Sequence, residues 1–351
     1  MVERLDVVDR RILYQLDLNS RQSLTQLGKK VRLKKHVVMY RIKRMQEDGI
    51  ITGFWTQIDS YKLGYIVFRF YLVYQYMTPE VEQELIAFLV KDKRTWVVES
   101  IIGKYDLGVF VWVKNLRDFY QFWGRLLDRF GDYFSEKIFS VYVLGLSYPC
   151  SYLLGEEFAQ KDRETSEVTG GAEVCIDEYD VRLLNLLAVD ARMSLVALAK
   201  ELGCSTQMVA NRMKRLRQQD VIQSYRVSYD LGMLGLKPFK VDVQLQEHSQ
   251  RKEIIAYIQR HPHLVFIGTS AGVSDLELEF DFKDSDDIHR VMKEIKERFP
   301  QAVRKYDYFI VEQVHKMRFL PELNSLSEKR GKEEARRLEG YVAEGPGERS
   351  Y

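Results

Sequence analysis

The sequence predicts an α+β protein in which one two-part module occurs twice. Residues 5–54 align without a gap on residues 176–225, with 15 identities at a constant offset of 171. Each copy begins with apolar residues at helical spacing and continues with segments in the order strand, helix, strand, strand, helix, strand. We therefore expect each copy to form a unit of three helices followed by an antiparallel sheet of four strands.

The composition is typical of a folded, soluble protein with more than one domain. The chain has 351 residues, of which 46% are apolar and 30% charged, and its net charge is +2. This length is too great for one ordinary core. The small net charge gives no overall field, so a surface that binds a polyanion must be local. No apolar run approaches the roughly 20 residues that span a bilayer, and the N-terminus is charged where a signal peptide is apolar, so we expect no membrane partner and a cytoplasmic location.

Each copy opens with an Asp-x-x-Asp motif, at residues 6–9 and 177–180. The first Asp can cap the N-terminus of a helix, and the second adds negative charge to the first turn of that helix. A second helix begins after Ser23 or Ser194, which are again residues of a capping type. Both helices are too short to be stable alone, so they need a partner on which to bury their apolar faces.

The third helix of each copy has one apolar stripe and one polar face. In the first copy Val38, Ile42 and Met45 follow the spacing i, i+4, i+7. The strand-like segments 50–58 and 221–229 come next. Three short helices joined by tight turns and followed by a wing strand are the pattern of a winged helix-turn-helix, whose recognition helix enters the major groove of DNA.

The polar face of the third helix carries the main sign of function. A run of charge is usually a solvated surface, but here the cations lie on the exposed side of the third helix of a unit that occurs twice. Residues 5–54 carry 11 Lys or Arg against 5 Asp or Glu, whereas residues 176–225 carry 7 against 6. We therefore expect phosphate contacts mainly from the first copy, and adenine readout by Gln or Asn of the second copy. The candidate DNA-binding residues are Lys34, Lys35, His36, Tyr40, Lys43, Arg44, Ser205, Thr206, Gln207, Asn211, Lys214 and Arg215.

The remaining part of each copy has the β-α-β-β-α-β order of a ferredoxin-like domain, with both helices on one face of the sheet. Many aromatic residues in the first sheet make an exposed second face improbable: Phe68, Phe70, Tyr71, Tyr74, Phe110 and Trp112. We expect the two sheets to pair, either within the chain as a pseudo-dimer or between chains as a homo-oligomer.

The repeat and the composition divide the chain into six segments. Residues 151–173 are polar and contain a Gly-Gly pair near their end, and the stretch after Pro321 is charged and rich in Gly. We predict a winged helix-turn-helix at 1–60, a ferredoxin-like effector-type domain at 61–148, a flexible linker at 149–174, a second winged helix-turn-helix at 175–232, a second ferredoxin-like domain at 233–318 and a charged, disordered tail at 319–351.

These motifs together resemble the Lrp/AsnC, or feast/famine, regulators. The matching residues are the opening L-D-x-x-D, the segments "NSRQSLTQLGKKV" and "DARMSLVALAKEL", the R-[IM]-K-R-[ML] of the third helix, and the Gly-x-x-Asp hairpins at 103–106 and 272–275. The resemblance covers about residues 5–146 and 176–315. It implies a regulator of transcription that binds double-stranded DNA and dimerises through its sheet domain.

Many members of that family bind an amino acid beside the Gly-x-x-Asp hairpin, so the resemblance also implies an effector site. The residues that would form it are Gly103, Asp106, Thr269, Ser270, Gly272 and Asp275. A purely structural explanation competes with this one, because Gly tolerates a positive φ in a hairpin and Asp accepts hydrogen bonds from turn amides. If a small molecule binds, we expect it at 269–275, where the residues are small.

Three departures distinguish this chain from the family pattern. The family has Gly and then Ser before the recognition helix; the second copy keeps Gly203 and Ser205, but the first copy has Arg32 and Lys34. The second copy has Asp220 at the position of Gly49. Most members carry one module per chain, so the tandem arrangement predicts two unlike DNA-reading heads in one molecule.

Two alternatives to a DNA-reading regulator remain. Siroheme decarboxylases of the same architecture, some of them also fused, use histidines and arginines near the first sheet strand, whereas residues 60–70 and 231–241 of this chain contain no histidine. An architectural or ligand-sensing protein without sequence readout is the second alternative. We expect no catalytic residues, cofactor or metal site, and we interpret the three cysteines as structural thiols: Cys150, Cys175 and Cys204.

Overall fold

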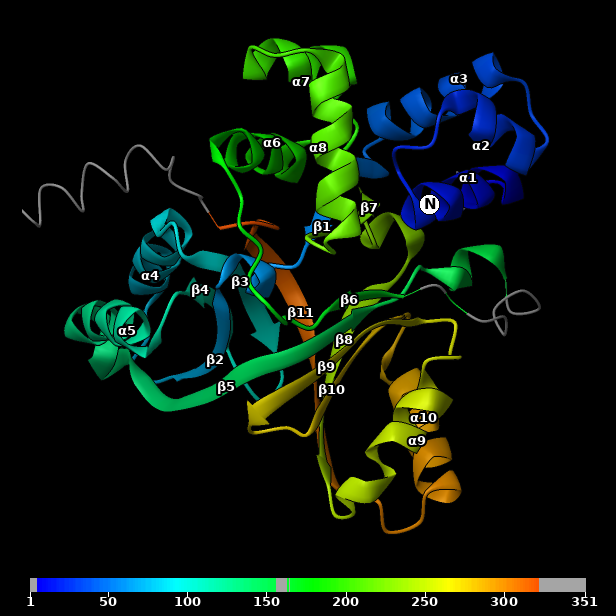
Figure 1. Ribbon diagram of the computed structural model, residues 1–351. Coiled ribbons are helices and arrows are strands. Elements are labelled where there is room, and N and C mark those ends of the chain that lie inside the picture. Colours follow the sequence, from blue (N-terminus) through cyan, green and yellow to red (C-terminus); the bar gives the residue numbers. More distant parts are fainter. Residues whose placement is uncertain (1–4, 156–162, 164, 322–351) are drawn as a thin grey trace, which may run out of the picture.

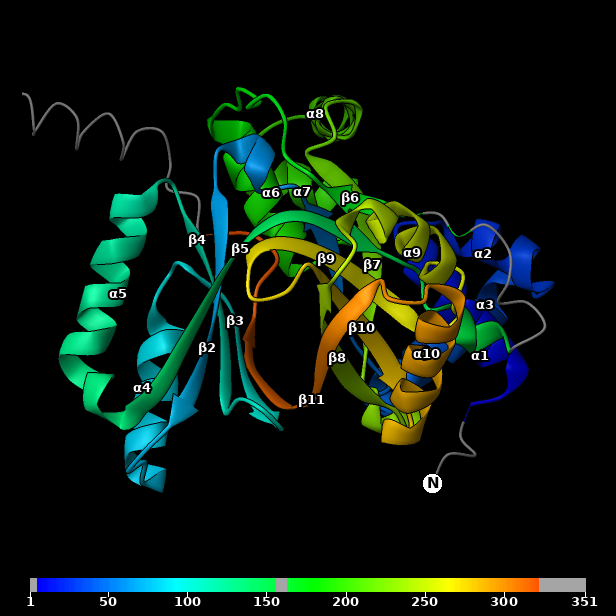
Figure 2. The same ribbon diagram turned by 90° about the horizontal axis from the view of Figure 1, so that it is seen from below.

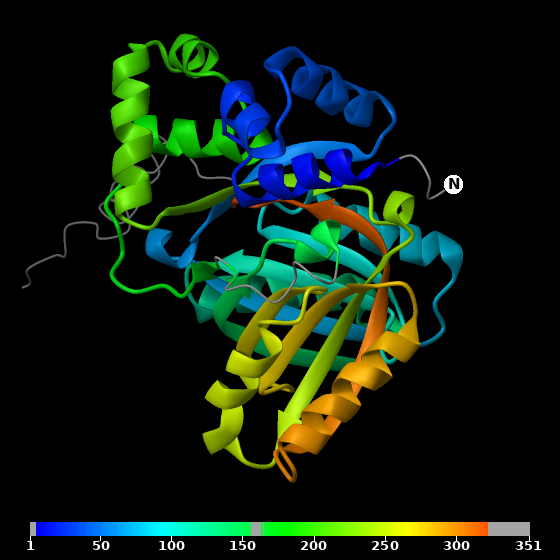
Figure 3. The same cartoon turned by 90° about the vertical axis from the view of Figure 1, so that its right-hand side faces the viewer.

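The computed structural model of the protein describes residues 5–155, 163 and 165–321. Two helical units stand next to each other on a β-barrel, which forms the body of the molecule (Figure 1, Figure 3). The barrel carries one pair of helices on each of two opposite outer sides (Figure 2). None of the helices in the described ranges combines the length and the apolar character needed to cross a membrane.

The order of elements agrees with the predicted module in both copies. The first copy contains α1 (Val7–Leu18), α2 (Leu24–Val31), α3 (Lys35–Glu47), β1 (Ile51–Ile58), β2 (Ile66–Tyr74), α4 (Pro79–Lys91), β3 (Thr95–Ile102), β4 (Leu107–Val113), α5 (Leu116–Phe130) and β5 (Phe134–Ser147). After the short strand β6 (Ser166–Val168), the second copy contains α6 (Glu178–Val189), α7 (Leu195–Leu202), α8 (Thr206–Gln218), β7 (Ile222–Tyr229), β8 (Lys237–Leu245), α9 (Arg251–Ile258), β9 (Leu264–Gly272), β10 (Leu276–Phe282), α10 (Ser285–Arg298) and β11 (Val303–Met317).

The predicted capping residues begin the helices. The side chain of Asp6 accepts a hydrogen bond from the backbone nitrogen of Asp9 at 2.7 Å, and Asp177 does the same for Asp180 at 3.0 Å. Ser23 and Ser194 cap α2 and α7 in the same way. These caps satisfy N–H groups that lack a partner within the helix, so the motifs fix where the helices start.

The two ferredoxin-like sheets join at both edges and close into one barrel. The strand order is β2-β4-β3-β11-β8-β10-β9-β5, and β5 also pairs with β2. Within this ring β3 pairs with β11 and β5 pairs with β9, so each copy supplies half of the barrel. Closure leaves none of these eight strands with a free edge. The chain therefore contains an intrachain pseudo-dimer.

Apolar cores fill the space between the barrel and its outer helices. α4 and α5 pack on the outer face of β2, β3 and β4, and α9 and α10 pack on the outer face of β8, β9 and β10. The other face of each sheet lines the barrel interior. The sequence predicts that the two sheets pair and so bury their second faces. These faces are buried, but the sheets join through hydrogen bonds between their edge strands, β3 with β11 and β5 with β9.

The barrel interior contains buried charges from both copies. Arg69 on β2 forms an ion pair with Glu277 on β10, and its Nη1 lies 3.6 Å from Asp242 on β8. Lys240 on β8 donates to Glu99 on β3 at 2.7 Å. Each of these side chains is at most 7% exposed. Each pair has one member in each copy, so the ion pairs link the two halves of the barrel. Separating the halves would leave buried charges without their partners, which is strongly destabilising.

The strands expected to act as wings do not fold back within their own copies. β1 pairs with β7 in an antiparallel two-stranded sheet that links the two helical units. Each strand also packs on the first helix of the other copy, because Val227 of β7 lies in the core of the first unit and Ile58 of β1 in that of the second. A single strand has no neighbour in its own copy to bond its backbone N–H and C=O groups. β1 and β7 provide these hydrogen bonds for each other.

The prediction of a flexible linker at 149–174 is wrong for the residues that the structure describes. Cys150 and Leu153 are buried in the core of the first helical unit, and the backbone nitrogen of Cys150 donates to Asp17 at 2.8 Å. Arg163 donates to the carbonyl oxygens of His261 and Leu264, each at 2.7 Å. Isolated anchors and backbone hydrogen bonds hold this segment, and neither produces a periodic pattern in the sequence.

The predicted tail at 319–351 also begins with docked residues. The ring of Phe319 stacks on Trp55 with 3.8 Å between centroids, and Leu320 is fully buried in the core of the second helical unit. The tail prediction is therefore wrong for 319–321. Residues 322–351 lie outside the described part of the chain.

Candidate nucleic-acid interface

The recognition helices α3 and α8 are each fixed to the first helix of their unit by ion pairs. Arg41 Nη1 lies 2.7 Å from Asp6 and 2.8 Å from Asp9, and Arg44 lies 2.5 Å from Asp9. Asp9 is only 1% exposed. The carboxylates of Asp6 and Asp9, which form the N-terminal cap of α1, therefore also bind α3 to the N-terminus of α1.

The second copy repeats this clamp. Arg212 Nη1 lies 2.7 Å from Asp177 and 2.8 Å from Asp180, and Arg215 also pairs with Asp180. Burial alone would raise the pKa of Asp177, but the hydrogen bond and charge of Arg212 outweigh it and hold that pKa below its usual value. In the first copy Arg41 lowers the pKa of Asp6 for the same reason, again against the effect of burial.

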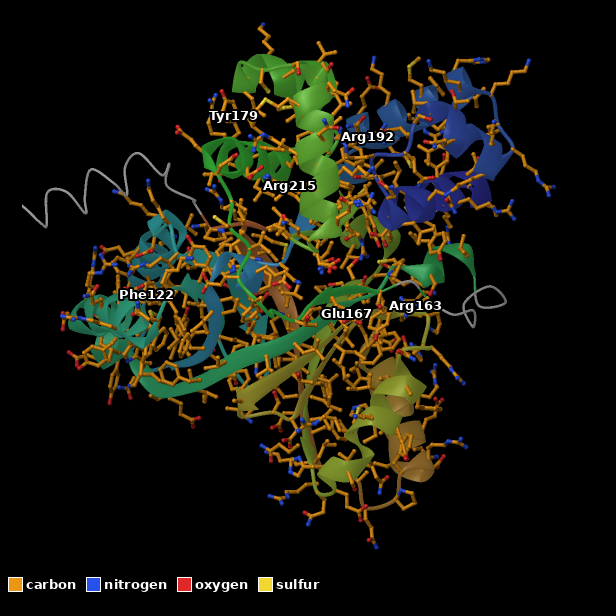
Figure 4. The ribbon with its side chains drawn as sticks, in the orientation of Figure 1. Phe122, Arg163, Glu167, Tyr179, Arg192 and Arg215 are labelled. Carbon is orange, nitrogen blue, oxygen red and sulfur yellow. The ribbon has the colours of Figure 1, made fainter. Side chains whose placement is uncertain are left out.

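Two of the predicted DNA-binding residues take part in these clamps. The side chains of Arg44 and Arg215 pair with Asp9 and Asp180, which are almost fully buried. Leaving such a carboxylate without its partner is costly, so these arginines have a structural role in the helical unit. Figure 4 shows Arg215 on α8, beside the helix α6 that carries its partner Asp180. The other ten predicted side chains are not part of the clamps.

The outer faces of α3 and α8 present the remaining predicted residues to solvent. Val38, Ile42 and Met45 are buried, as the sequence predicts. Over residues 34–43 the exposed side chains of α3 and its N-cap are Lys34, Lys35, His36, Met39, Tyr40 and Lys43, and Gln46 and Glu47 are exposed in the last turn. Their counterparts on α8 are Ser205, Thr206, Gln207, Asn211 and Lys214, which are exposed, and Ala210, which is partly buried. Each head thus offers a continuous polar surface on one helix.

The turn before each recognition helix keeps the same backbone in spite of its different residues. Arg32 has a φ of 58° and Gly203 a φ of 66°, both in the left-handed region. Lys34 makes no side-chain cap at the start of α3, whereas Ser205 accepts a hydrogen bond from the backbone of Met208 at 3.2 Å. Asp220 likewise keeps the left-handed turn of Gly49, with φ values of 54° and 75°. The first copy therefore retains the geometry while exchanging a cap for positive charge.

Reciprocal arginine contacts fix the two heads relative to each other. Arg21 Nη1 donates to the carbonyl oxygen of Ala191 at 2.6 Å, and Arg192 Nη1 donates to that of Ser20 at 2.6 Å. The two guanidinium groups also lie over the rings of Tyr225 and Phe54, 5.6 and 5.1 Å from their centroids. Figure 4 shows Arg192 at the border between the two helical units. The heads therefore form one body with pseudo-two-fold symmetry.

Two equivalent grooves lie where each recognition helix meets the other copy. The groove beside α8 has a volume of about 660 Å³, and its charged lining residues are Arg21, Lys214 and Arg217. The groove beside α3 has a volume of about 620 Å³, and its charged lining residues are Lys43, Asp190 and Arg192. Both grooves present cations next to a recognition helix, as a surface that follows a phosphate backbone requires.

The predicted effector residues are placed at the two seams of the barrel. Asp106 accepts a hydrogen bond from the backbone nitrogen of Tyr74 at 2.7 Å, and Asp275 accepts one from Leu245 at 2.7 Å. A Cβ on Gly272 would lie 2.5 Å from the carbonyl oxygen of Phe139 on β5. Both carboxylates thus brace their hairpins, and Gly272 allows β9 to approach β5.

The two hairpins differ in what surrounds them. In the first copy Lys104 pairs with Asp307 at 2.7 Å and Gly103 packs against Phe309, both on β11. In the second copy Ser270 donates to the carbonyl oxygen of Ser274 at 3.2 Å, and Thr269 lies on β9 opposite β5. The second carboxylate oxygen of Asp275 lies 3.5 Å from both Arg251 and His248.

Sequence reasoning missed the clamp, the reciprocal arginines and the charged barrel interior. One signal was present for the first two, because the Asp and Arg residues of the clamps and the pair Arg21 and Arg192 are identical in both copies. The buried Arg69 and Lys240 occupy equivalent positions but lie in strands that read as ordinary apolar segments. Their partners come from strands that are distant in sequence, which no local pattern indicates.

Comparison with known proteins relates the chain to regulators of transcription. Residues 176–217 match the AsnC-type helix-turn-helix domain, and residues 5–52 match a winged helix-turn-helix DNA-binding domain. An uncharacterized HTH-type transcriptional regulator of Pyrococcus abyssi is 33% identical over 119 residues, which are 34% of this chain and 79% of that protein. The HTH-type transcriptional regulator Ptr1 of Methanocaldococcus jannaschii is 29% identical over 135 residues, which are 38% of this chain and 82% of that protein.

A solved structure resembles the whole tandem arrangement. The crystal structure of the siroheme decarboxylase NirDL has a TM-score of 0.60, covers 95% of this chain and 100% of its own, and is 14% identical in sequence. At this identity the likeness concerns the fold alone. It shows that the arrangement of elements in this chain also occurs in a solved structure.

Proposed function

Because this chain belongs to the Lrp/AsnC family of transcriptional regulators, we propose that it binds double-stranded DNA through the outer faces of α3 and α8 and thereby regulates transcription. The observation that supports this most strongly is the pair of exposed polar helix faces, each held by a buried ion-pair clamp on one rigid body. A surface fixed in this way loses little conformational freedom on binding. We also propose that the protein acts in the cytoplasm.

Salt dependence of DNA binding tests this proposal. Replacing Lys35 and Lys43 with Ala should weaken binding to every duplex and reduce the slope of log affinity against log salt by roughly 0.9 for each lost phosphate contact. Fluorescence anisotropy with a labelled duplex measures both quantities. The control replaces Lys293 and Lys296, which are exposed on α10, and should leave the slope unchanged. A slope unaltered by the first pair would contradict the proposal.

The contribution of the second head is tested by Lys214→Ala. We propose that its effect on non-specific affinity is smaller than that of the Lys35 and Lys43 pair, since the first copy carries more cations around its recognition helix. Equal losses per lysine would contradict this assignment. Such a result would point to the cationic groove beside α8 as an equal phosphate site.

We also propose that an amino-acid effector, where one acts, binds at 269–275. The favouring observation is that Asp275 has one oxygen facing Arg251 and His248, so groups of both signs lie next to each other as the two ends of an amino acid require. Calorimetry with the full set of amino acids tests this. Binding that Asp275→Ala abolishes supports the assignment. Binding that only Asp106→Ala abolishes would reverse it, and no heat with any amino acid would favour the purely bracing role.

Against the alternative of a siroheme decarboxylase, we propose that the protein is not an enzyme. The supporting observations are the lack of histidine in residues 60–70 and 231–241 and the regulator names of the sequence relatives. Incubation with siroheme followed by mass spectrometry of the tetrapyrrole provides the test. Loss of carboxyl groups from siroheme would overturn this proposal.

A further inference from the structure

The two DNA-facing surfaces differ at almost every matched position. The pairs are Lys34 and Ser205, Lys35 and Thr206, His36 and Gln207, Met39 and Ala210, and Tyr40 and Asn211. Lys43 and Lys214 are the one identical pair among the six matched positions of these two surfaces. The pseudo-two-fold axis of the heads therefore relates two backbones but not two chemical surfaces.

The surface of α3 fits a half-site rich in guanine and thymine. Lys34 and His36 at the start of α3 can donate to the O6 and N7 acceptors of guanine. Met39 and Tyr40 are 53% and 65% exposed, which is unusual for large apolar side chains on a helix of a folded unit. Apolar contact with the methyl group of thymine is the base contact that such side chains make.

The surface of α8 fits adenine. Gln207 Nε2 donates to Asn211 Oδ1 at 3.0 Å, one helical turn away. This hydrogen bond orients the two amides together, and it leaves the Asn211 amide nitrogen as a donor and the Gln207 oxygen as an acceptor on two exposed side chains. Adenine presents the matching acceptor N7 and donor N6 in the major groove.

The relative placement of the heads is fixed by bonds on both sides. β1 and β7 pair along their length, and the arginine contacts described above hold each first-to-second helix turn against the other copy. A chain with two unlike heads in fixed positions cannot present the same surface to both halves of a palindrome. Homodimeric helix-turn-helix proteins read palindromes because their two heads are identical.

We propose that the chain binds a non-palindromic DNA site in one orientation, with α3 on a half-site containing guanine and thymine and α8 on a half-site containing adenine. This inference rests on the proposed function, because it assigns the specificity of the same surface. A single chain thereby defines a direction on the DNA. An ordinary homodimer of one-module chains has no such property.

Selection of bound duplexes from a random pool with the full chain tests the inference. The expected motif has two unlike halves, and exchanging one half for a copy of the other should lower affinity at least about fivefold. A palindromic motif, or equal affinity for the exchanged duplexes, would overturn the inference while leaving DNA binding intact. A complete lack of binding to any duplex would overturn the proposed function and the inference together.

A helix-exchange variant gives the second arm of the test. Lys34→Ser, Lys35→Thr, His36→Gln, Met39→Ala and Tyr40→Asn together give α3 the surface of α8, at positions that are all exposed. Selection should then return a motif with an adenine-containing half on both sides. The reverse exchange on α8 serves as the matched control and should give two guanine- and thymine-containing halves. Motifs unchanged by both exchanges in variants with parental thermal unfolding would contradict the inference.

Discussion

At matched positions of the two sheets, the first copy has Tyr71, Gly108 and Phe110 where the second has Asp242, Glu277 and Glu279. The first half of the barrel interior is thus largely aromatic, and the second half is acidic. The aromatic half also carries Arg69, which pairs with the acidic half. The two copies share a fold, but their buried surfaces complement each other.

This difference explains why the copies pair within one chain. Each second copy brings Lys240 and the buried carboxylates of Asp242 and Glu277, so two second copies together would place two lysines against four buried carboxylates, and the partly exposed Glu279 residues would add further negative charge. Uncompensated buried charge of this kind is strongly destabilising. Pairing of unlike copies avoids it, because the first copy supplies a cation and few anions. Differences between the two copies therefore matter in two places. They balance the charge inside the barrel, and they give the two heads unlike DNA-facing surfaces.

Loss of Arg69 should have the largest effect on stability. Arg69→Met leaves Glu277 buried without its partner, and we expect a loss of about 3–5 kcal/mol in the free energy of unfolding. Urea denaturation followed by circular dichroism measures it. The control is Arg129→Met, whose ion pair with Glu84 is more than half exposed and should contribute about 1 kcal/mol at most. Equal losses for the two variants would show that the copies do not depend on this charge.

A pH effect should separate the second copy from the first. Burial raises the pKa of Asp281 to about 7, although the hydrogen bond from Tyr152 opposes the shift. The folded protein then keeps a proton that the unfolded chain releases, so stability falls as pH rises from about 4 to about 7 and is constant above that range. Trp112 occupies the equivalent position in the first copy and does not titrate.

The variant Asp281→Asn isolates this effect. Relative to the parent protein, it should gain stability progressively between pH 4 and pH 7, because the amide carries no charge in either state. Thermal unfolding across this pH range provides the measurement. A difference between the two proteins that does not change with pH would rule out the buried proton.

Readout by the second head should appear in Asn211→Ala. Losing an amide that pairs with adenine should reduce discrimination at that base pair by roughly 1–3 kcal/mol, with a smaller loss of non-specific affinity. Tyr40→Ala is the matched change in the first copy and should relax preference in the other half of the site. Binding-site selection with each variant decides between these outcomes, and an unchanged motif with Asn211→Ala would contradict adenine readout.

The smallest expected effect concerns the turn before each recognition helix. Arg32→Gly should stabilise the first head by about 1 kcal/mol, because Gly adopts the left-handed backbone without a Cβ clash. The reciprocal change Gly203→Arg should destabilise the second head by a similar amount, since no heavy atom lies within 4 Å of the added Cβ and only the backbone is affected. Denaturation midpoints of the two variants that move in the same direction would contradict this account.

Much of this architecture could be predicted from the sequence because the internal repeat shows each element twice. The caps at Asp6 and Ser23 and the buried stripe of α3 follow from local patterns, and the structure confirms them. Closure of the barrel could not be predicted, because it depends on which strand edges meet. The pairing of β1 with β7 was missed for the same reason.

The candidate site also has features that local sequence patterns predict and features that depend on residues distant in the sequence. Exposure of the recognition surfaces follows from helical periodicity, so the sequence could identify which side chains face solvent. The roles of Arg44 and Arg215 could not be separated from those of their neighbours, because their partners in α1 and α6 lie 35 residues away. Docking of 149–155 and 319–321 depends on single residues such as Cys150 and Leu320, which form no pattern.

The most direct test of the central claim is DNA binding by one fourfold variant of the full chain. It combines Lys35→Ala, Lys43→Ala, Asn211→Ala and Lys214→Ala, all exposed on α3 and α8. The control combines Lys91→Ala, Gln121→Ala, Lys283→Ala and Lys293→Ala, which remove the same charge from exposed positions around the barrel. We predict that the first variant loses DNA binding and the second retains it, both with parental thermal unfolding. Equal binding by the two variants would contradict the assignment of the recognition helices as the DNA-reading surface.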